Sequence, residues 1–183
     1  MIRLFVGLEL PPALRERLAG LGAGIEGVRW VDEENLHLTL RFIGEVDGGQ
    51  AEDIAEALDR VRAAPFKITL DGLGTFGSGA RLRAVWVGVM PSPPLRALQG
   101  KVERAVQRAG LAGEGRRFIP HVTLARLGSG AAKDRLGPFI EYNAAFRSKP
   151  VPVTGFTLFE SFLSSGGADY QAVERFPLAG RET

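Results

Sequence analysis

The chain contains two histidines, and each begins the same kind of four-residue segment. His37 opens the sequence His-Leu-Thr-Leu, and His121 opens the sequence His-Val-Thr-Leu. Histidine is the side chain whose unperturbed pKa lies nearest to neutral pH, so one histidine can accept a proton while another donates one. A repeated segment that uses every histidine of the chain therefore indicates an acid and a base for one reaction.

Thr39 and Thr123 each follow a histidine at a spacing that puts both side chains on one face of a strand. Side chains at positions i and i+2 of a β-strand point to the same face, about 7 Å apart. The aliphatic residues between them point to the opposite face and enter the core. If an approximate twofold axis relates the halves of the chain, the two histidine–threonine pairs face each other across a groove.

Two imidazoles and two hydroxyls around a groove suit the chemistry of a phosphate ester. A neutral imidazole can take the proton of the attacking oxygen, an imidazolium can protonate the leaving oxygen, and the hydroxyls can donate to the other phosphate oxygens. Each such proton transfer contributes on the order of 10²–10⁴ in rate. Because the chain has no cysteine and only two histidines, it cannot form a thiolate nucleophile or a histidine-rich zinc site. We therefore expect no metal and no cofactor.

Composition places the chain among ordinary globular proteins. With 183 residues, 45% hydrophobic and 24% charged, it is long enough for one domain with a hydrophobic core, which we expect over residues 1–183. The absence of cysteine suits a cytoplasmic protein. No apolar run is long enough to span a bilayer, and no membrane association is expected. The net charge is +2, and arginine supplies most of the positive charge. Arginine fits phosphate bidentately, which permits a phosphate-bearing substrate.

Hydrophobic periodicity predicts the elements that must position these pairs. Two of the predicted strands carry the histidines, and both halves contain a long amphipathic helix preceded by two prolines or by a glycine turn. The pattern predicts an α+β fold of two similar lobes. Strands are predicted at 2–9, 36–43, 66–70, 82–89, 119–125, 151–160 and 170–176, helices at 13–21, 51–61 and 95–109, and loops at 72–79, 128–137 and 164–167.

With these segments, the sequence resembles the two-histidine phosphoesterase superfamily, and within it the RNA 2′,3′-cyclic phosphodiesterases, also called 2′-5′ RNA ligases. The similarity extends over nearly the whole chain and is strongest around the two histidines. The resembling segments are residues 3–6 with 10–11, Trp30 with 34–45, 76–77 with 83–88, 118–126, and 159–161 with Tyr170.

The resemblance implies a bilobal fold of two antiparallel sheets flanked by helices, with a central groove. It implies hydrolysis of a 2′,3′-cyclic phosphate at an RNA 3′ end to a 2′-phosphate, and ATP-independent joining of tRNA halves through a 2′-5′ bond. His37 would then protonate the departing 3′ oxygen, and His121 would activate water. Thr39 and Thr123 would hold the phosphate. From the residues alone, either histidine could play either role.

Three arginines are candidates for contacts with RNA phosphate. Strand alternation places Arg41 and Arg117 on the histidine face. The same alternation places Arg126 on the opposite face, but a β-bulge after Ala125 would turn it toward the groove. An ordinary solvated surface position is the alternative for each of these arginines.

Two aromatic residues, Phe5 and Tyr170, are candidates for stacking on an RNA base. The position of Tyr170 beside a predicted hairpin suits the edge of a groove. Strand alternation points Phe42 toward the core, and Trp30 and Trp86 are expected to be packing residues.

Two other functions remain open from the sequence. The same fold could act on small cyclic nucleotides or 2′-5′ oligoadenylates, which a comparison of mononucleotide and RNA substrates would reveal. The protein could also be a non-catalytic module that binds RNA ends, although binding alone does not need two matched titratable groups. We expect the protein to act as a monomer.

Overall fold

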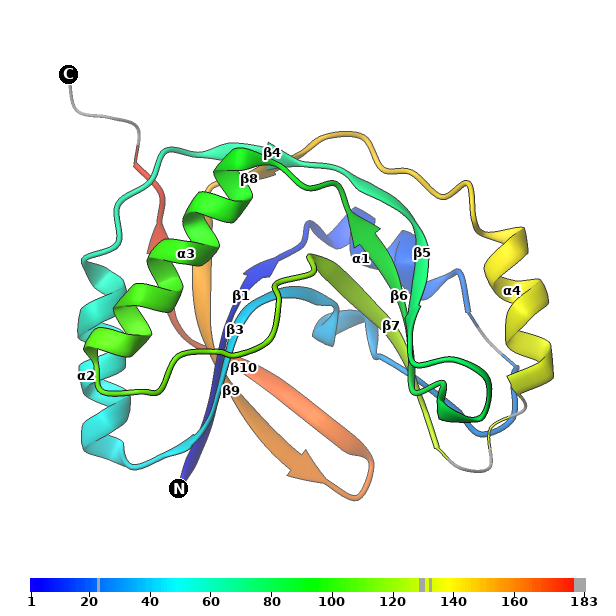
Figure 1. Cartoon of the computed structure of the whole chain (residues 1–183), viewed down its shortest axis with the longest axis horizontal. Helices are drawn as coiled ribbons and strands as arrows, with labels where there is room; N and C mark the ends of the chain where they lie inside the picture. Colours follow the sequence, from blue (N-terminus) through cyan, green and yellow to red (C-terminus); the bar gives the residue numbers. More distant parts are fainter. Residues whose placement is uncertain (23, 129–130, 132, 180–183) are drawn as a thin grey trace.

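An antiparallel sheet of eight strands forms the centre of the molecule in the computed structural model, which describes residues 1–22, 24–128, 131 and 133–179 (Figure 1). The strands lie in the order β10-β9-β1-β3-β7-β6-β5, and β2 also pairs with β7. Their bounds are β1 (Ile2–Glu9), β2 (Val28–Trp30), β3 (His37–Val46), β5 (Leu70–Phe76), β6 (Ala84–Val89), β7 (His121–Leu127), β9 (Gly155–Ser164) and β10 (Gly167–Pro177). A second, two-stranded antiparallel sheet pairs β4 (Phe66–Ile68) with β8 (Val151–Val153).

The large sheet divides into two lobes between β3 and β7. Only one residue pair, Leu38 opposite Val122, joins these two strands. The strands β1, β9 and β10 continue the sheet on the side of β3, whereas β6 and β5 continue it on the side of β7. The predicted α+β fold with two antiparallel lobes is therefore confirmed, and the two histidine-bearing strands meet at its centre.

Helices cover the outer faces of the lobes (Figure 1). In Figure 1, α2 (Gly48–Asp59) and α3 (Pro93–Arg108) lie together beside β3, and α4 (Leu136–Tyr142) lies at the opposite end of the molecule. Side chains of Asp47 and Ser92 cap α2 and α3 by accepting from the backbone N–H groups three residues later. The remaining helices are α1 (Pro12–Ala19) and the 3₁₀ turns η1 (Glu33–Asn35), η2 (Gly79–Arg81) and η3 (Lys133–Arg135). No helix in the described part of the chain is long and apolar enough to cross a membrane.

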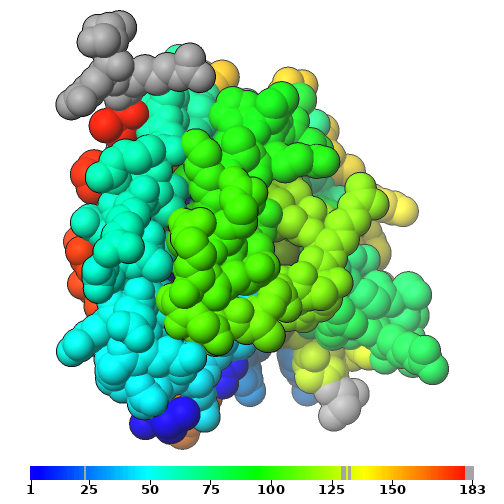
Figure 2. Space-filling model, turned by 60° about the vertical axis from the view of Figure 1, so that its left-hand side comes forward, coloured from blue at the N-terminus to red at the C-terminus, as the bar shows by residue number. Residues whose placement is uncertain are grey.

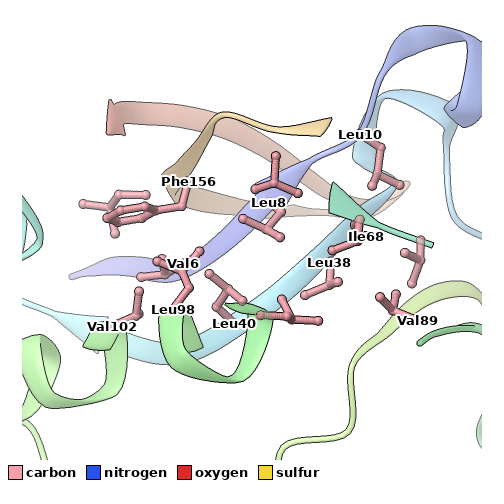
Figure 3. Close-up of a cluster of buried hydrophobic side chains, with 14 of the residues drawn as sticks. Val6, Leu8, Leu10, Leu38, Leu40, Ile68, Val89, Leu98, Val102 and Phe156 are labelled. Atoms are coloured by element: carbon pink, nitrogen blue, oxygen red, sulfur yellow. The ribbon is translucent and has the colours of Figure 1, made fainter. Parts of the chain in front are cut away.

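The main core lies between the β1–β3 pair and α3 (Figure 3). Leu38 and Leu40 of β3 are nearly inaccessible to solvent and pack with Leu98 and Val102 of α3. Burial of each such side chain contributes on the order of 2 kcal/mol. Because these leucines occupy the core face of β3, the intervening Thr39 and the preceding His37 are left on the other face.

A β-bulge interrupts both histidine strands at the same place. In β3 the pairing with β1 omits Leu40, and in β7 the pairing with β6 omits Leu124. Each omitted leucine follows the threonine of the His-x-Thr segment. A bulge adds one residue to one strand and reverses the inward–outward alternation beyond it. The faces predicted by simple alternation therefore fail for the residues after Leu40 and Leu124.

Two predicted loops are partly wrong. Residues 72–76 belong to β5. The glycine at position 74 suits this strand because the indole of Trp86 on β6 covers it, and a Cβ on Gly74 would lie 2.3 Å from that ring. The predicted loop at 128–137 contains η3 and the start of α4, while residues 129–130 and 132 lie outside the described residues. The hairpin turn predicted at 164–167 is confirmed between β9 and β10.

Candidate active site

His37 is the first residue of β3, and a backbone carbonyl holds its ring in place. The Nδ1–H group donates to the carbonyl oxygen of Asn35, at 2.6 Å. Since a carbonyl can only accept, this bond places the proton of the neutral ring on Nδ1 and leaves Nε2 free to act as a base. Nε2 lies 2.8 Å from Oγ1 of Thr39, whose hydroxyl can donate to it. The His-x-Thr segment thus forms a local hydrogen-bonded unit.

His121 is the first residue of β7 and is held in the same way. Its Nδ1–H group donates to the carbonyl oxygen of Ile119 at 2.6 Å. The acceptor again lies two residues before the histidine. The neutral ring therefore also presents an unprotonated Nε2, so both histidines have the same tautomer and the same attachment to their strands.

The pairing of Leu38 with Val122 brings the two His-x-Thr segments together. Continued by one residue in each direction, this antiparallel register places His37 opposite Thr123 and Thr39 opposite His121. The histidines then occupy diagonal positions, whose side chains start about 7–8 Å apart. A tetrahedral phosphate fits between two imidazoles at that separation, within reach of both hydroxyls.

Burial and a nearby arginine lower the pKa of both histidines. Desolvation, together with the charges of Arg126 and His121 and against the opposing hydrogen bond to Asn35, lowers the pKa of His37 to about 4. Desolvation and the charge of Arg126 likewise lower the pKa of His121. Arg126 therefore acts on both rings, and in the unliganded protein both histidines are neutral at pH 7.

Aromatic rings enclose the imidazole of His37. Its centroid lies 4.8 Å from that of Phe5, 5.2 Å from that of Tyr170 and 5.9 Å from that of Phe159. On the other lobe, the ring of His121 lies 4.8 Å from Phe76 at its edge. These rings remove water from the imidazoles, which is the physical cause of the lowered pKa of each histidine.

A groove of about 700 Å³ opens in front of His37 and Thr39. Three arginines, Arg3, Arg29 and Arg126, line it, whereas Asp32 is its one acidic lining residue. The groove continues along the β9–β10 hairpin, where Tyr170 forms part of the wall. Among the described residues, no three His, Cys, Asp or Glu side chains lie close enough together to hold a metal ion. The site is a basic groove in front of His37 and Thr39, and it suits an anionic phosphate ester.

Comparison with known proteins identifies this arrangement. The family model described as "LigT like Phosphoesterase" matches the chain twice, over residues 8–86 and 87–168. The chain belongs to the LigT-like phosphoesterase family. The two matches divide the chain so that each contains one His-x-Thr segment.

Relatives from distant organisms resemble almost the entire chain. A protein of Aeropyrum pernix named RNA 2′,3′-cyclic phosphodiesterase is 36% identical over 161 residues, which cover 87% of this chain and 90% of the relative. An Escherichia coli protein of the same name is 34% identical over 181 residues and 96% of each chain. A crystal structure of E. coli LigT complexed with 3′-AMP superposes with a TM-score of 0.75 at 30% identity, covering 98% of this chain and 99% of that one.

Arg41 does not face the groove, contrary to the prediction from strand alternation. The bulge at Leu40 turns Arg41 to the core face of β3, where it is 7% exposed. Its Nε donates to Oε2 of Glu103 at 2.5 Å, and its other nitrogens donate to the carbonyl oxygens of Phe42 and Ala112. The same bulge places Phe42 in the groove wall, 39% exposed, although alternation had directed it to the core. Arg41 therefore ties β3 to α3 and does not contact substrate in the groove.

Of the other two candidate arginines, Arg126 lines the groove and Arg117 does not. The bulge at Leu124 turns Arg126 to the histidine face, where it lines the groove, so the bulge expected near Ala125 is present one residue earlier. Arg117 lies outside this groove, because the segment before β7 turns toward the start of α3 and carries Arg117 into a separate pocket. The prediction that Arg117 shares the histidine face is wrong.

Phe5 and Tyr170 both lie beside His37, but only Tyr170 has the exposure that stacking requires. Phe5 is 4% exposed, and its ring stacks on Phe159 at a centroid distance of 4.9 Å. Phe5 therefore supports His37 and offers no free face to a base, contrary to the prediction. Tyr170 is half-buried at the groove wall, with its ring edge-on to both His37 and Phe5. Trp30 packs against Phe139, as expected for a packing residue.

The sequence interpretation missed Asn35, the residue that holds His37. Asn35 is 6% exposed; its Nδ2 donates to the carbonyl oxygen of Ala168, and its Oδ1 accepts from the backbone N–H of Tyr170. Its side chain thereby links the start of β3 to β10, while its carbonyl fixes the imidazole. A polar residue two positions before the histidine, inside the family-like segment 34–45, was the available signal. Arg3 and Arg29 of the groove were also missed, because nothing local distinguishes them from surface arginines.

Proposed function

We propose that this protein hydrolyses the 2′,3′-cyclic phosphate at RNA 3′ ends and leaves a 2′-phosphate. The observation that carries the proposal is the pair of His-x-Thr segments, each with its histidine Nδ1–H bonded to a carbonyl and its Nε2 unprotonated in the neutral ring, at the junction of β3 and β7. Membership of the LigT-like phosphoesterase family and relatives named RNA 2′,3′-cyclic phosphodiesterase support the same substrate.

In the proposed reaction, the cyclic phosphate lies between the two imidazoles. Nε2 of His121 takes a proton from water, whose oxygen forms a bond to phosphorus. The bond from phosphorus to the 3′ oxygen breaks, and the Nε2–H of His37 protonates that oxygen. Thr39 and Thr123 donate hydrogen bonds to the non-bridging oxygens, and Arg126 neutralises their charge. Tyr170 stacks on or flanks the terminal nucleoside.

To act as the proposed acid, His37 must be protonated, but its imidazole is neutral at pH 7 before a substrate binds. Burial and Arg126 hold the pKa of His37 near 4. A phosphate anion in the groove offsets the charge of Arg126 and stabilises the imidazolium, which raises this pKa. Substrate binding therefore supplies the condition under which His37 becomes an acid, and the assignment of His121 as the base is part of the same proposal.

Finer features belong to the same proposal. The two lobes act as one domain over residues 1–183, and the protein acts as a monomer in the cytoplasm. With a ribose hydroxyl in place of water, the same two histidines would join RNA ends, including tRNA halves, by a 2′-5′ bond without ATP. Roles are proposed here for His37, Thr39, His121, Thr123, Arg126 and Tyr170.

The decisive experiment uses a short RNA that ends in a 2′,3′-cyclic phosphate. We expect conversion to the 2′-phosphate, distinguished from the 3′-phosphate by chromatography against both standards. Turnover should continue in excess EDTA, because the proton transfers use imidazoles alone. Each of the variants His37→Ala and His121→Ala should lower kcat by at least about 10²-fold.

Three outcomes would contradict the proposal. Binding of the RNA without turnover would favour a non-catalytic module that recognises RNA ends. Rates on a cyclic mononucleotide or a 2′-5′ oligoadenylate far above those on RNA would move the substrate to small nucleotides. Near-normal turnover in either histidine variant would remove that histidine from the reaction.

A further inference from the structure

A second pocket lies on the α3 side of β7, outside the groove of the two histidines. It has a volume of about 290 Å³ and is bordered by the first turn of α3 and by the segment that leads into β7. Figure 2 views this face, where the green α3 and the yellow-green segment border a hollow. The floor and walls include Leu95, Phe118 and Ile119, and two arginines, Arg96 and Arg117, stand at its edge.

The charge of this pocket is one-sided. No acidic residue lines it. Arg96 and Arg117 are exposed, and neither forms an ion pair within the described part of the chain. By contrast, the buried Arg41 and the exposed Arg175 each pair with a glutamate. Two unpaired guanidinium groups beside a pocket attract an anion that can accept planar, bidentate hydrogen bonds, such as a phosphate.

The apolar part of the pocket suits a nucleobase. Ile119 is 45% exposed, although it is a large aliphatic residue, and Phe118 is half-buried beside it. Single-stranded nucleic acids are commonly held by a cationic edge together with an aromatic or aliphatic surface on which a base can lie. One nucleotide of RNA combines the two features that the pocket would recognise, whereas an acidic peptide would use only the arginines.

The pocket is joined to the catalytic centre through the backbone of one residue. Ile119 forms part of the pocket with its side chain, and its carbonyl oxygen accepts the Nδ1–H bond that holds His121. The next residue, Pro120, also lines the pocket, and its carbonyl accepts from the N–H of Val89 on β6. One residue therefore contributes its side chain to the pocket and its carbonyl to the hydrogen bond that holds His121.

We infer that this pocket binds a second nucleotide of the RNA, away from the nucleotide that carries the cyclic phosphate. Arg96 and Arg117 contact its phosphate, and the base lies on Phe118 and Ile119. The inference rests on the proposed function for its substrate, and it adds a reason why the protein would favour an RNA end over a cyclic mononucleotide. A mononucleotide fills only the groove of the two histidines.

The test compares two substrates in a set of matched variants. For wild type, Arg96→Ala, Arg117→Ala, their double variant and Arg108→Ala, kcat/KM is measured on a short RNA with a 2′,3′-cyclic phosphate and on cytidine 2′,3′-cyclic phosphate. Arg108 is exposed at the other end of α3, so its variant removes the same charge from the same helix without touching the pocket.

We expect each pocket variant to lower the ratio of kcat/KM on RNA to that on the mononucleotide by about fivefold, and the double variant by more than tenfold. The Arg108→Ala protein should keep the wild-type ratio. The salt dependence of RNA binding should also fall, by a slope of about 0.7 for each phosphate contact removed.

An unchanged ratio in the double variant, or an equal drop in the Arg108→Ala protein, would overturn the inference. Failure of the proposed function looks different, because wild type would then turn over neither substrate or only the cytidine 2′,3′-cyclic phosphate. In that case the dissociation constant of the same RNA tests the pocket by itself. Equal affinity of wild type and double variant would overturn the pocket as an RNA site, and weaker binding by the double variant would support it.

Discussion

The pH dependence of folding stability tests how strongly the fold keeps His37 uncharged. Burial lowers the pKa of His37 from 6.5 to about 4. Between these values the unfolded chain binds a proton at this site and the folded protein does not. Stability is therefore fully present above pH 6.5 and falls as the pH drops toward 4. A pH of 5 lies about 1.5 units below the pKa of this histidine in the unfolded chain, so protonation of the unfolded state lowers the free energy of unfolding by about 2 kcal/mol.

The assay is urea unfolding at pH 7.5 and pH 5.0 for wild type and His37→Asn. Carboxyl groups shared by both proteins cancel in the comparison. We expect wild type to lose about 2 kcal/mol more than the variant between the two pH values. When wild type is compared in the same way with His121→Asn, which removes the less strongly buried histidine, the extra loss of unfolding free energy in wild type should be smaller.

Histidine NMR provides an independent measurement, because each of these variants leaves a single histidine to titrate. The spectrum of wild type should show one ring with a pKa near 4 and the Nδ1–H tautomer above it. Inorganic phosphate should raise that pKa. Equal pH dependence of wild type and His37→Asn, or a His37 pKa of 6.5 in the unliganded protein, would refute the reasoning from burial.

Three further changes should have defined effects. Arg41→Ala removes the cation beside the partly buried Glu103 and the hydrogen bonds to two carbonyl oxygens, and it should cost about 3 kcal/mol in urea unfolding, whereas Arg60→Ala, in an exposed helical pair, should cost less than about 0.5 kcal/mol. Asn35→Ala removes the link to β10 and should lower kcat more than it raises KM, with a cost of about 2 kcal/mol in stability. Arg126→Ala should raise the NMR pKa of both histidines and weaken phosphate binding about tenfold, and a falling pKa would contradict its place beside them.

Much of the catalytic pair could be predicted from local sequence. Strand alternation over three residues placed His37 with Thr39 and His121 with Thr123. His37 and Thr39 line the groove, and the Leu38–Val122 pairing brings the second segment beside them. Alternation held for His37 and Thr39 because both residues precede the bulge. Beyond the bulges it failed for Arg41, since a bulge depends on the pairing with a neighbouring strand that the local pattern does not contain.

The rest of the site depends on contacts between distant segments. Arg41 finds Glu103 on α3, and Asn35 finds Ala168 and Tyr170 on β10. Such partners become neighbours only when the strands are ordered in the sheet. The turn that carries Arg117 away from the groove likewise follows from the packing of its segment against the start of α3.

The sequence by itself therefore determined which residues we propose for the chemistry: two imidazoles, each followed by a hydroxyl on the same face of a strand, with no thiol and no third histidine to suggest another reaction. This information is local, because it depends only on residue type and on the two-residue period of a strand. The tertiary structure alone decided that the two segments meet at Leu38 and Val122, and which arginine joins them. It also decided that both rings are neutral before substrate binds, because desolvation is set by everything packed around a group and not by its neighbours in the chain.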